Sequence, residues 1–566
     1  MPEHLSWCVD MLSRASPQAV IKRRSRWLRK WTQRAKEIGL DPDPAWDIPD
    51  PHMAAVMSCK RLQLLDEIIA AEGYGDINLA SDLRAGFDLV GRAPESNVLP
   101  GKITPATMHP DDLVSTTVRA REALKLSLGS SGDAEQDLRL WNKTLEEVER
   151  GWLIGPYDWD ELGDTDVVSH RFPLVQGQGG KLRPIDDYSR SGVNACVTTL
   201  EQPTVDTVDV AACMFSNLCS GLAKNKRCSK LMGRSFDLTA AYRQLCVSLA
   251  SRNFAVLAVY NPHAKKTMLF TQVYLPFGAR ASVNGFIRCS RCIQWLATKC
   301  LLIPTTSYYD DFIVASPDDL ADNTGDTMEL LFKLLGWVFD SEGPKADVFS
   351  RHVSALGVSF DLTETEHGVI SVDNTVKRKD DVSNLISAVL DRGELSYKQG
   401  LELRGKLAFA NAQVMGRGLM VTLVWPLTSS ILGFGQLCKA ELEGRLFWAI
   451  HMHRQAALDA EVLDYVLSFL EEFERPIADC IGLYQDDSRS MISSPVDAAS
   501  SARALSSLSS VTFLHRALTD RWWLDFDPPP LASNGTAEVH SPWRALKQVA
   551  AWMGLSGLYL PRPARD

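Results

Sequence analysis

The pattern of hydrophobic and polar positions is helical over the first 150 residues. In "IKRRSRWLRKWTQRAKEIG", Trp27 and Trp31 are four residues apart and share one helix face. The proline-rich, acidic stretch "LDPDPAWDIPDPH" predicts a linker. The following stretch "MSCKRLQLLDEIIAAEG" predicts a short helix that ends at Gly73. We therefore expect a helical N-terminal extension over residues 1–150.

From about residue 151 to residue 378, strand-like runs alternate with helical ones. One strand is expected to end at Asp237 in "RSFDLTAAYRQL". In "SYYDDFIVAS", two aspartates directly precede an apolar run, which predicts a tight hairpin with Asp310 and Asp311 at its turn. Residues 379–455 are helical again, whereas residues 456–566 include a serine- and alanine-rich stretch that is typical of loops. An α+β fold is the expected class.

Composition and charge leave the kind of partner open. The 566 residues are 45% hydrophobic and 23% charged, as in ordinary globular proteins. The net charge of -10 does not suggest a polyanion partner, although a local basic surface is still possible. Eight basic residues lie between Lys22 and Lys36. They either contact nucleic acid or form the solvated face of a helix whose tryptophans pack inward.

Cysteines and apolar stretches bear on the cellular compartment. Of the twelve cysteines only Cys289 and Cys292 form a CxxC pair, and tetrahedral zinc needs four ligands. Free thiols on a helix, in a reducing compartment, are therefore expected. The N-terminus carries no long apolar run, so we expect an intracellular protein, cytoplasmic or nuclear, and not a secreted one. The apolar stretch from Gly418 is interrupted by Pro426, which favours a buried helix pair over a membrane span.

Three aspartates form the candidate site. A lone aspartate at a strand end, such as Asp237, is usually a cap or a turn former. If Asp310 and Asp311 converge on it, the carboxylates repel each other unless a cation lies between them. Hard oxygen ligands suit Mg²⁺, and two such ions about 3.5–4 Å apart can activate a 3′-hydroxyl and stabilise a leaving pyrophosphate. The set therefore points to nucleotidyl transfer.

Six motifs follow one another along the chain: "GKLRPIDDYSRSGVN", "DLTAAYRQL", "LPFGARASVNGF", "YYDDF", "GPKADV" and "LGVSF". In this order they resemble the motifs of reverse transcriptases, in particular the retrotransposon type. The resemblance covers roughly residues 170–365 and continues more weakly to about residue 455. It implies a right-hand polymerase with fingers and an antiparallel palm sheet in residues 151–378 and a helical thumb or connection in residues 379–455.

The resemblance also implies a role for particular residues. Asp237 and Asp310 would hold two Mg²⁺ ions, with Mn²⁺ as a possible substitute, and Asp311 completes the doublet. Lys345 would protonate the leaving pyrophosphate, or else is a surface lysine in a turn. Leu356 and Gly357 would lie at the centre of the hairpin that grips the primer.

Further residues are expected to contact the incoming nucleotide. Lys181 and Arg183 would bind its triphosphate, because lysine offers a point charge and arginine a fork of donors. Tyr242 would block a ribose 2′-hydroxyl, which favours DNA over RNA synthesis. The remaining members of this set are Phe277 and Gly278, in a loop that leads into a helix with Ser282 as its cap, and Tyr309, which is bulkier than is common at that place in the family.

The function that the resemblance implies is an RNA-directed DNA polymerase of a retroelement, which adds dNTPs to a primer on an RNA or DNA template. The alternative is an inactive or domesticated relative that only binds nucleic acid. The tail, residues 456–566, is expected to be at most a degenerate RNase H-like domain, since "CIGLYQDDSRS" lacks the glycine-rich strands that should follow it. Residues expected to line a basic template cleft are Lys181, Arg183, Arg234, Arg243 and Arg280.

Overall fold

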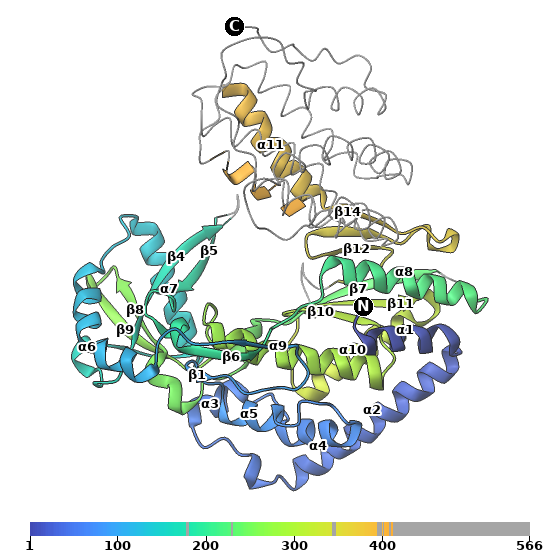
Figure 1. The fold of residues 1–566 in the computed structure, drawn as a ribbon, viewed down its shortest axis with the longest axis horizontal. Coiled ribbons are helices and arrows are strands. Elements are labelled where there is room, and N and C mark those ends of the chain that lie inside the picture. The colour runs from blue at the N-terminus through green and yellow to red at the C-terminus, as the bar shows by residue number, and fades with distance from the viewer. Residues whose placement is uncertain are drawn as a thin grey trace, which may run out of the picture. The chain divides into compact units, whose positions relative to one another are not determined.

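The chain forms two compact units, Met1–Val372 and Asp373–Asp566 (Figure 1). The α+β class is confirmed, because helices and mainly antiparallel sheets alternate along the first unit. The computed structural model describes residues 1–176, 180–227, 230–341 and 347–392, together with 399, 401–403, 405–406 and 409–410.

The N-terminal region is helical up to Ala85, as its pattern predicts, but residues 86–109 contain the short strands β1 (Gly91–Arg92) and β2 (Gly101–Thr104) instead of the expected helix. Ser16 caps the long second helix by accepting a hydrogen bond from the Ala19 N–H, and Pro17 occupies its first turn. The helix predicted to end at Gly73 does so, with Gly73 in the left-handed conformation (φ 75°). The elements are α1 (Glu3–Arg14), α2 (Pro17–Leu40), η1 (Pro44–Trp46), α3 (Pro51–Met57), α4 (Leu62–Glu72) and α5 (Leu79–Ala85).

These helices share one hydrophobic core with the strands that carry the aspartates. Trp27 and Trp31 of α2 belong to the same buried cluster as Phe236 and Phe312. Burial of large aromatic side chains is among the strongest contributions to a core. The N-terminal helices and the sheet therefore stabilise each other.

A five-stranded sheet has the order β3-β9-β8-β4-β5. Its neighbours pair antiparallel except β4 with β8, which are parallel. Helix α7 (Ala134–Glu149) packs on it, with Trp141 edge-on to Phe270 at 5.7 Å between ring centroids. The strands are β3 (Leu153–Tyr157), β4 (Val168–Gln176), β5 (Lys181–Asp186), β8 (Val256–Asn261) and β9 (Lys266–Gln272).

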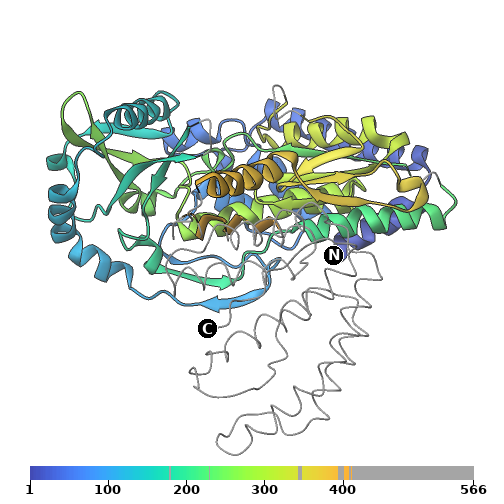
Figure 2. The same cartoon turned by 90° about the horizontal axis from the view of Figure 1, so that it is seen from above.

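An antiparallel three-stranded sheet has the order β10-β11-β7 and lies at the other end of the first unit (Figures 1 and 2). Strand β11 is central and almost wholly buried. Helix α10 (Ala321–Leu335) packs against it through Phe332, whose ring lies 5.6 Å from that of Phe312. The strands are β7 (Leu231–Asp237), β10 (Thr305–Tyr308) and β11 (Asp311–Pro317).

Two further three-stranded sheets have the orders β1-β6-β2 and β12-β13-β14. Their strands are β1 (Gly91–Arg92), β2 (Gly101–Thr104), β6 (Val197–Glu201), β12 (His352–Ala355), β13 (Val358–Asp361) and β14 (Ser371–Asn374). The other α-helices of the first unit are α6 (Pro110–Ser127), α8 (Val208–Lys224) and α9 (Arg280–Trp295).

The start of α9 differs from the prediction. Its cap position is Ala279, so Ser282 lies inside the first turn and is fully buried. The capping residue lies directly before the helix, where its side chain can accept from the first free N–H groups. Ser282 is the third residue of α9 and therefore lies too far along the helix for that role. The helix continues as a π-helical segment, Leu296–Cys300.

In the second unit the structure describes helix α11 (Val376–Arg392), and the predicted helix stop at Gly393 lies outside the described residues. No helix in the described part of the chain is long and apolar enough to cross a membrane. The apolar stretch from Gly418 and the predicted RNase H-like tail lie outside the described residues, as does most of the predicted thumb.

Candidate functional site

The backbone brings the three predicted aspartates together. Strand β7 ends at Asp237, β11 begins at Asp311, and the antiparallel register places these two residues directly opposite each other. Asp310 lies in the two-residue turn between β10 and β11, and its carbonyl oxygen accepts a hydrogen bond of 3.2 Å from the Leu238 N–H. All three residues are partly buried. The predicted hairpin, with the doublet at its turn, is thus confirmed.

A fourth carboxylate residue, Asp340, joins this end of the sheet. Its N–H donates to the Asp237 carbonyl oxygen at 2.9 Å, and its Oδ1 accepts a hydrogen bond from Thr239 Oγ1 at 2.5 Å. The adjacent Phe339 forms an isolated antiparallel β-bridge with Leu238. The sequence analysis missed Asp340, although an acidic residue where an apolar run gives way to "SEGPKADV" was a usable signal.

The donor chemistry of these residues suits a hard divalent cation, since carboxylate oxygens are the ligands that Mg²⁺ prefers. In the described residues, however, no group of three or more His, Cys, Asp or Glu side chains is arranged so that it could hold a metal ion. The convergence therefore exists at the level of the backbone, and the predicted metal ligands stay a prediction.

The turn that carries Asp310 has an uncommon backbone conformation. Tyr309, its first residue, has φ 55°, a left-handed conformation that bulky side chains rarely adopt. A positive φ at this position is what a two-residue hairpin with the usual strand twist requires. Ser290 Oγ of α9 donates to the Tyr309 carbonyl oxygen at 2.6 Å, which helps to hold the turn in this form.

Tyr242 lies in an aromatic cluster beside this turn. Its ring stacks on Phe286 at 4.5 Å and meets Phe277 edge-on at 5.4 Å. Burial, with further contributions from Tyr309 and Asp310, raises the pKa of Tyr242 well above its usual range. Tyr242, Tyr309 and Asp310 are therefore neighbours, whereas the Phe277 side chain is 59% exposed.

Gly278 follows Phe277 and faces the five-stranded sheet. It has φ 105°, and a Cβ atom there would lie 3.0 Å from the Asp186 carbonyl oxygen. Asn194 Nδ2 donates to the Gly278 carbonyl oxygen at 3.1 Å. Both the conformation and the close approach therefore require glycine.

The remaining predicted residues belong to other elements. Lys181 and Arg183 lie on β5, the edge strand of the five-stranded sheet, and Arg183 is exposed. Leu356 (φ 50°) and Gly357 (φ 79°) form the two-residue turn between β12 and β13, so this predicted hairpin is also present. Lys345 lies outside the described residues.

Two of the five arginines and lysines predicted to line a basic cleft do not do so. Arg234 is paired with Glu329 at 2.9 Å, and Arg243 is paired with the buried Glu147. Their charges are neutralised inside the fold, which the sequence did not indicate because the partners lie about 95 residues away. Arg280, by contrast, lines a surface hollow together with Lys102.

The basic helix α2 uses part of its charge for packing. Arg24 is 1% exposed and donates to the carbonyl oxygens of Leu301 and Leu302, and Arg23 donates to that of Cys300. These bonds satisfy carbonyl groups near the end of the π-helical segment that follows α9, where cations are favourable. Trp27 and Trp31 pack inward, as one of the two interpretations expected, whereas a nucleic-acid contact by the exposed basic residues of α2 stays a prediction.

The two cysteines of the CxxC pair are free and buried in α9. Burial raises the pKa of Cys289 to about 12 and raises the pKa of Cys292 well above its usual range. Such thiols are poor metal ligands and poor nucleophiles. The prediction of free thiols on a helix is therefore confirmed.

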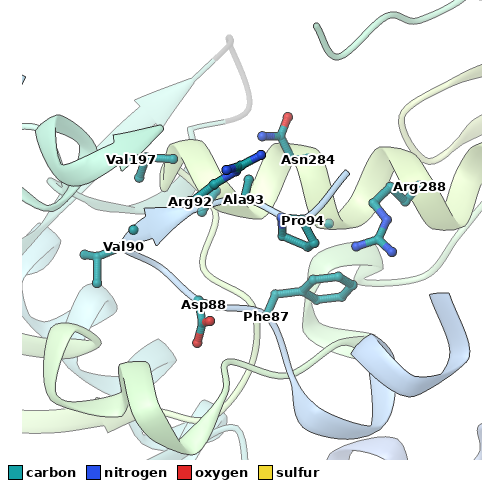
Figure 3. Close-up of a pocket in the computed structure, with 12 residues that line it drawn as sticks. Phe87, Asp88, Val90, Arg92, Ala93, Pro94, Val197, Asn284 and Arg288 are labelled. Atoms are coloured by element: carbon teal, nitrogen blue, oxygen red, sulfur yellow. The ribbon is translucent and has the colours of Figure 1, made fainter. Parts of the chain in front are cut away.

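A small hollow lies between α9 and the segment that leads into β1 (Figure 3). Asn284 and Arg288 line it from α9, and Phe87, Asp88 and Arg92 from the other side. None of Asp237, Asp310 and Asp311 lines this hollow, so it is not part of the carboxylate site.

Comparison with known proteins gives structural neighbours only. No protein-family model matches the sequence. No curated protein matches it either. Among solved structures, a foamy viral protease-reverse transcriptase in complex with dsDNA is 14% identical with a TM-score of 0.39, and the match covers 70% of this chain and 72% of that chain.

Two further structures of the foamy viral protease-reverse transcriptase match similarly. The form named dRH, in complex with ds DNA, is 15% identical with a TM-score of 0.40, over 73% of this chain and 63% of that chain. The form in complex with an RNA/DNA hybrid is 13% identical with a TM-score of 0.41, and the match covers 70% of this chain and 46% of that chain. In these two matches the chain spans less than two thirds of its neighbour.

Proposed function

We propose that this protein is an RNA-directed DNA polymerase. The observation that carries the proposal is the convergence of Asp237, Asp310 and Asp311, which the register of β7 with β11 and the turn after β10 produce. Carboxylate residues that the backbone brings to one end of a sheet are suited to phosphoryl chemistry through bound cations. In this proposal β10, β11 and β7 form the palm of a right-hand polymerase, β4 and β5 belong to the fingers, and α11 would be part of the thumb expected over residues 379–455.

Asp237 and Asp310 would each contact two Mg²⁺ ions, for which Mn²⁺ could substitute, and Asp311 would complete the set. When bound, these ions supply positive charge to the attacking 3′-oxygen and to the leaving pyrophosphate. The role of the chain is to hold the carboxylates in register at the end of a buried sheet. Asp340, linked to Asp237 through the backbone, is well placed to support that end.

The aromatic residues beside the turn would select the nucleotide. The Tyr242 ring is held between Phe286 and Phe277, so it cannot easily rotate away from a sugar that approaches Asp310. A rigid ring in that position excludes a 2′-hydroxyl by steric overlap and admits a deoxyribonucleotide. Gly278 and Tyr309 would contact the same nucleotide through their backbones.

Other parts of the first unit would hold the remaining groups. Lys181 and Arg183 on β5 would bind the triphosphate, and Lys345 would protonate the pyrophosphate. Leu356 and Gly357 would contact the primer. We further propose a retroelement origin, an RNA or DNA template with its primer as partner, and a reducing, intracellular compartment, which the buried free cysteines favour.

The test is primer extension. Poly(rA) primed with oligo(dT) is offered with Mg²⁺ and dTTP, and an Asp310→Asn variant serves as the control. We expect incorporation by the parent protein and a large loss in the variant. If the parent protein binds the primed template but incorporates nothing, the alternative of a non-catalytic nucleic-acid-binding relative holds instead. Equal use of UTP would reject the selective role of Tyr242.

A further inference from the structure

The outer edge of strand β10 is hydrogen-bonded to neighbouring elements at Thr305 and Ser307, and the same series of bonds continues to Tyr309 in the turn that carries Asp310. Strand β10 is the edge strand of its sheet, so every second residue directs its backbone N–H and C=O groups away from β11. Exposed strand edges are usually left to water or protected by charge. Here the edge is instead bonded to α9 and to the residues that precede α8.

Asp206 forms two hydrogen bonds with Ser307, in the middle of this edge. Its N–H donates to the Ser307 carbonyl oxygen at 2.9 Å, and its Oδ2 accepts from the Ser307 N–H at 3.0 Å. Both backbone groups of one strand residue are thus bonded to a single aspartate. Asp206 is 3% exposed, and Arg291 Nη1 of α9 neutralises it at 2.9 Å from Oδ1.

Helix α9 supplies the rest of the contacts, from one face. Gln294 Nε2 donates to the Thr305 carbonyl oxygen at 2.8 Å and to Asp206 Oδ2 at 2.5 Å. One turn earlier, Ser290 Oγ donates to the Tyr309 carbonyl oxygen at 2.6 Å. The bonded strand positions are 305, 307 and 309, which is the period of two that a strand edge presents.

We propose that Asp206, Ser290 and Gln294 act as positioning residues that set the place of the Asp310–Asp311 turn for the reaction. This inference rests on the proposed polymerase function. A turn with Tyr309 at positive φ is strained, and such strain persists only where surrounding contacts determine the conformation. These contacts end on the residue directly before Asp310, so a small shift at Tyr309 is passed to the carboxylates.

The test compares two serine-to-alanine variants that make the same chemical change. Ser290→Ala removes the bond to the turn. Ser13→Ala is the matched control, because Ser13 is also 2% exposed on a helix and also donates to a backbone carbonyl, that of Asp10 at 2.8 Å, but does not contact the hairpin. The measurements are kcat and KM for primer extension, and hydrogen exchange of the amides in residues 305–311.

We expect Ser290→Ala to lower kcat roughly tenfold, with KM for the primed template within about twofold, because misplaced catalytic groups cost rate more than binding. Asp206→Asn should lower kcat by roughly 10²-fold. Both should speed exchange in residues 305–311, and Ser13→Ala should change neither quantity. If Asp206→Asn does not fold, Ser290→Ala decides alone.

An unchanged kcat in Ser290→Ala, or a fall equal to that of Ser13→Ala, would overturn the proposal. So would unchanged exchange in residues 305–311. Failure of the proposed function has a different signature. The parent protein would then incorporate no nucleotide at all, and the positioning role would fall with it, whatever the exchange data say about the hairpin.

Discussion

Two groups of carboxylates in the first unit have opposite surroundings. At the five-stranded sheet, Glu147 and Asp186 are buried on either side of Arg171, each 2.7 Å from its guanidinium, and Arg243 also pairs with Glu147. At the three-stranded sheet, Asp237, Asp310 and Asp311 are only partly buried, at a strand end and a turn. The first group is neutralised within the core, whereas the second keeps part of its surface exposed at one end of its sheet.

The pKa values of the first group follow from this arrangement. Burial alone would lower the pKa of Arg171, but Asp186, Tyr274 and Glu147 outweigh it and raise that pKa well above its usual range. Burial would likewise raise the pKa of Glu147, yet Arg171 and Arg243 lower it. Arg171 and Glu147 therefore stay charged near neutral pH. Buried carboxylates of this kind are structural, and only carboxylates that remain accessible can serve a substrate.

The largest expected effect is on the buried group. Arg171→Met should lower the free energy of unfolding by about 3–5 kcal/mol, because it leaves two buried carboxylates without their shared cation. Urea denaturation at pH 7 measures this. Arg183→Met on the neighbouring strand is the control, since its exposed side chain should contribute within about 0.5 kcal/mol. Equal effects of the two changes would remove the distinction between the groups.

The second prediction concerns the accessible group. Asp310→Asn should lower kcat for dTTP incorporation by roughly 10²–10³-fold, since it removes charge at the proposed site. The change in stability should be small, because the substitution keeps the shape of a partly buried turn residue. Asp318→Asn, at the far end of β11 and 45% exposed in its side chain, is the control and should remain within about twofold of the parent. A variant Asp310→Asn with the parent's kcat would show that this carboxylate has no part in the reaction.

The third prediction concerns the selection of the nucleotide sugar by Tyr242, which lies beside Asp310. Tyr242→Ala should raise the use of UTP relative to dTTP at least about tenfold, because the ring that excludes a 2′-hydroxyl is removed. Tyr242→Phe keeps the ring and should keep the selection. Competition between the two nucleotides in primer extension measures the ratio. Unchanged selection in the alanine variant contradicts the steric role.

The fourth prediction concerns a pH dependence of stability that depends on His4, a neighbour of Asp206. Burial lowers the pKa of His4 from 6.5 to about 4, with Arg291 and Lys299 acting in the same direction and Asp206 opposing them. The unfolded chain therefore takes up a proton at a higher pH than the folded one, so stability is lost as the pH falls from 6.5 towards 4.

At pH 5 the loss due to His4 should be up to about 2 kcal/mol relative to pH 7.5. His4→Gln should lack this part of the pH dependence. The measurement is the difference in urea midpoint between parent and variant at the two pH values. If the parent and the variant lose stability in parallel, His4 is not the titrating group.

Local features of the fold were predictable. Helix α4 ends at Gly73 because glycine readily adopts the left-handed conformation there. The turn at Asp310 follows from a polar doublet beside an apolar run. Both signals act over a few residues. The capping role of Ser282 was wrong because neighbouring residues, and not the serine alone, determine where α9 begins. Asp340 was missed because only the return of the chain after α10 brings it to Asp237.

By itself the sequence determined the hairpin, its doublet of aspartates, and the tryptophan face of α2, since each depends on spacing along a single element. Only the tertiary structure decided that Asp237 lies opposite Asp311, that Arg234 and Arg243 are neutralised, and that Asp206 holds the edge of β10. These pairings join residues roughly 70 to 100 positions apart. Charge and hydrogen-bond partners at such separations are chosen by packing, which no local pattern records.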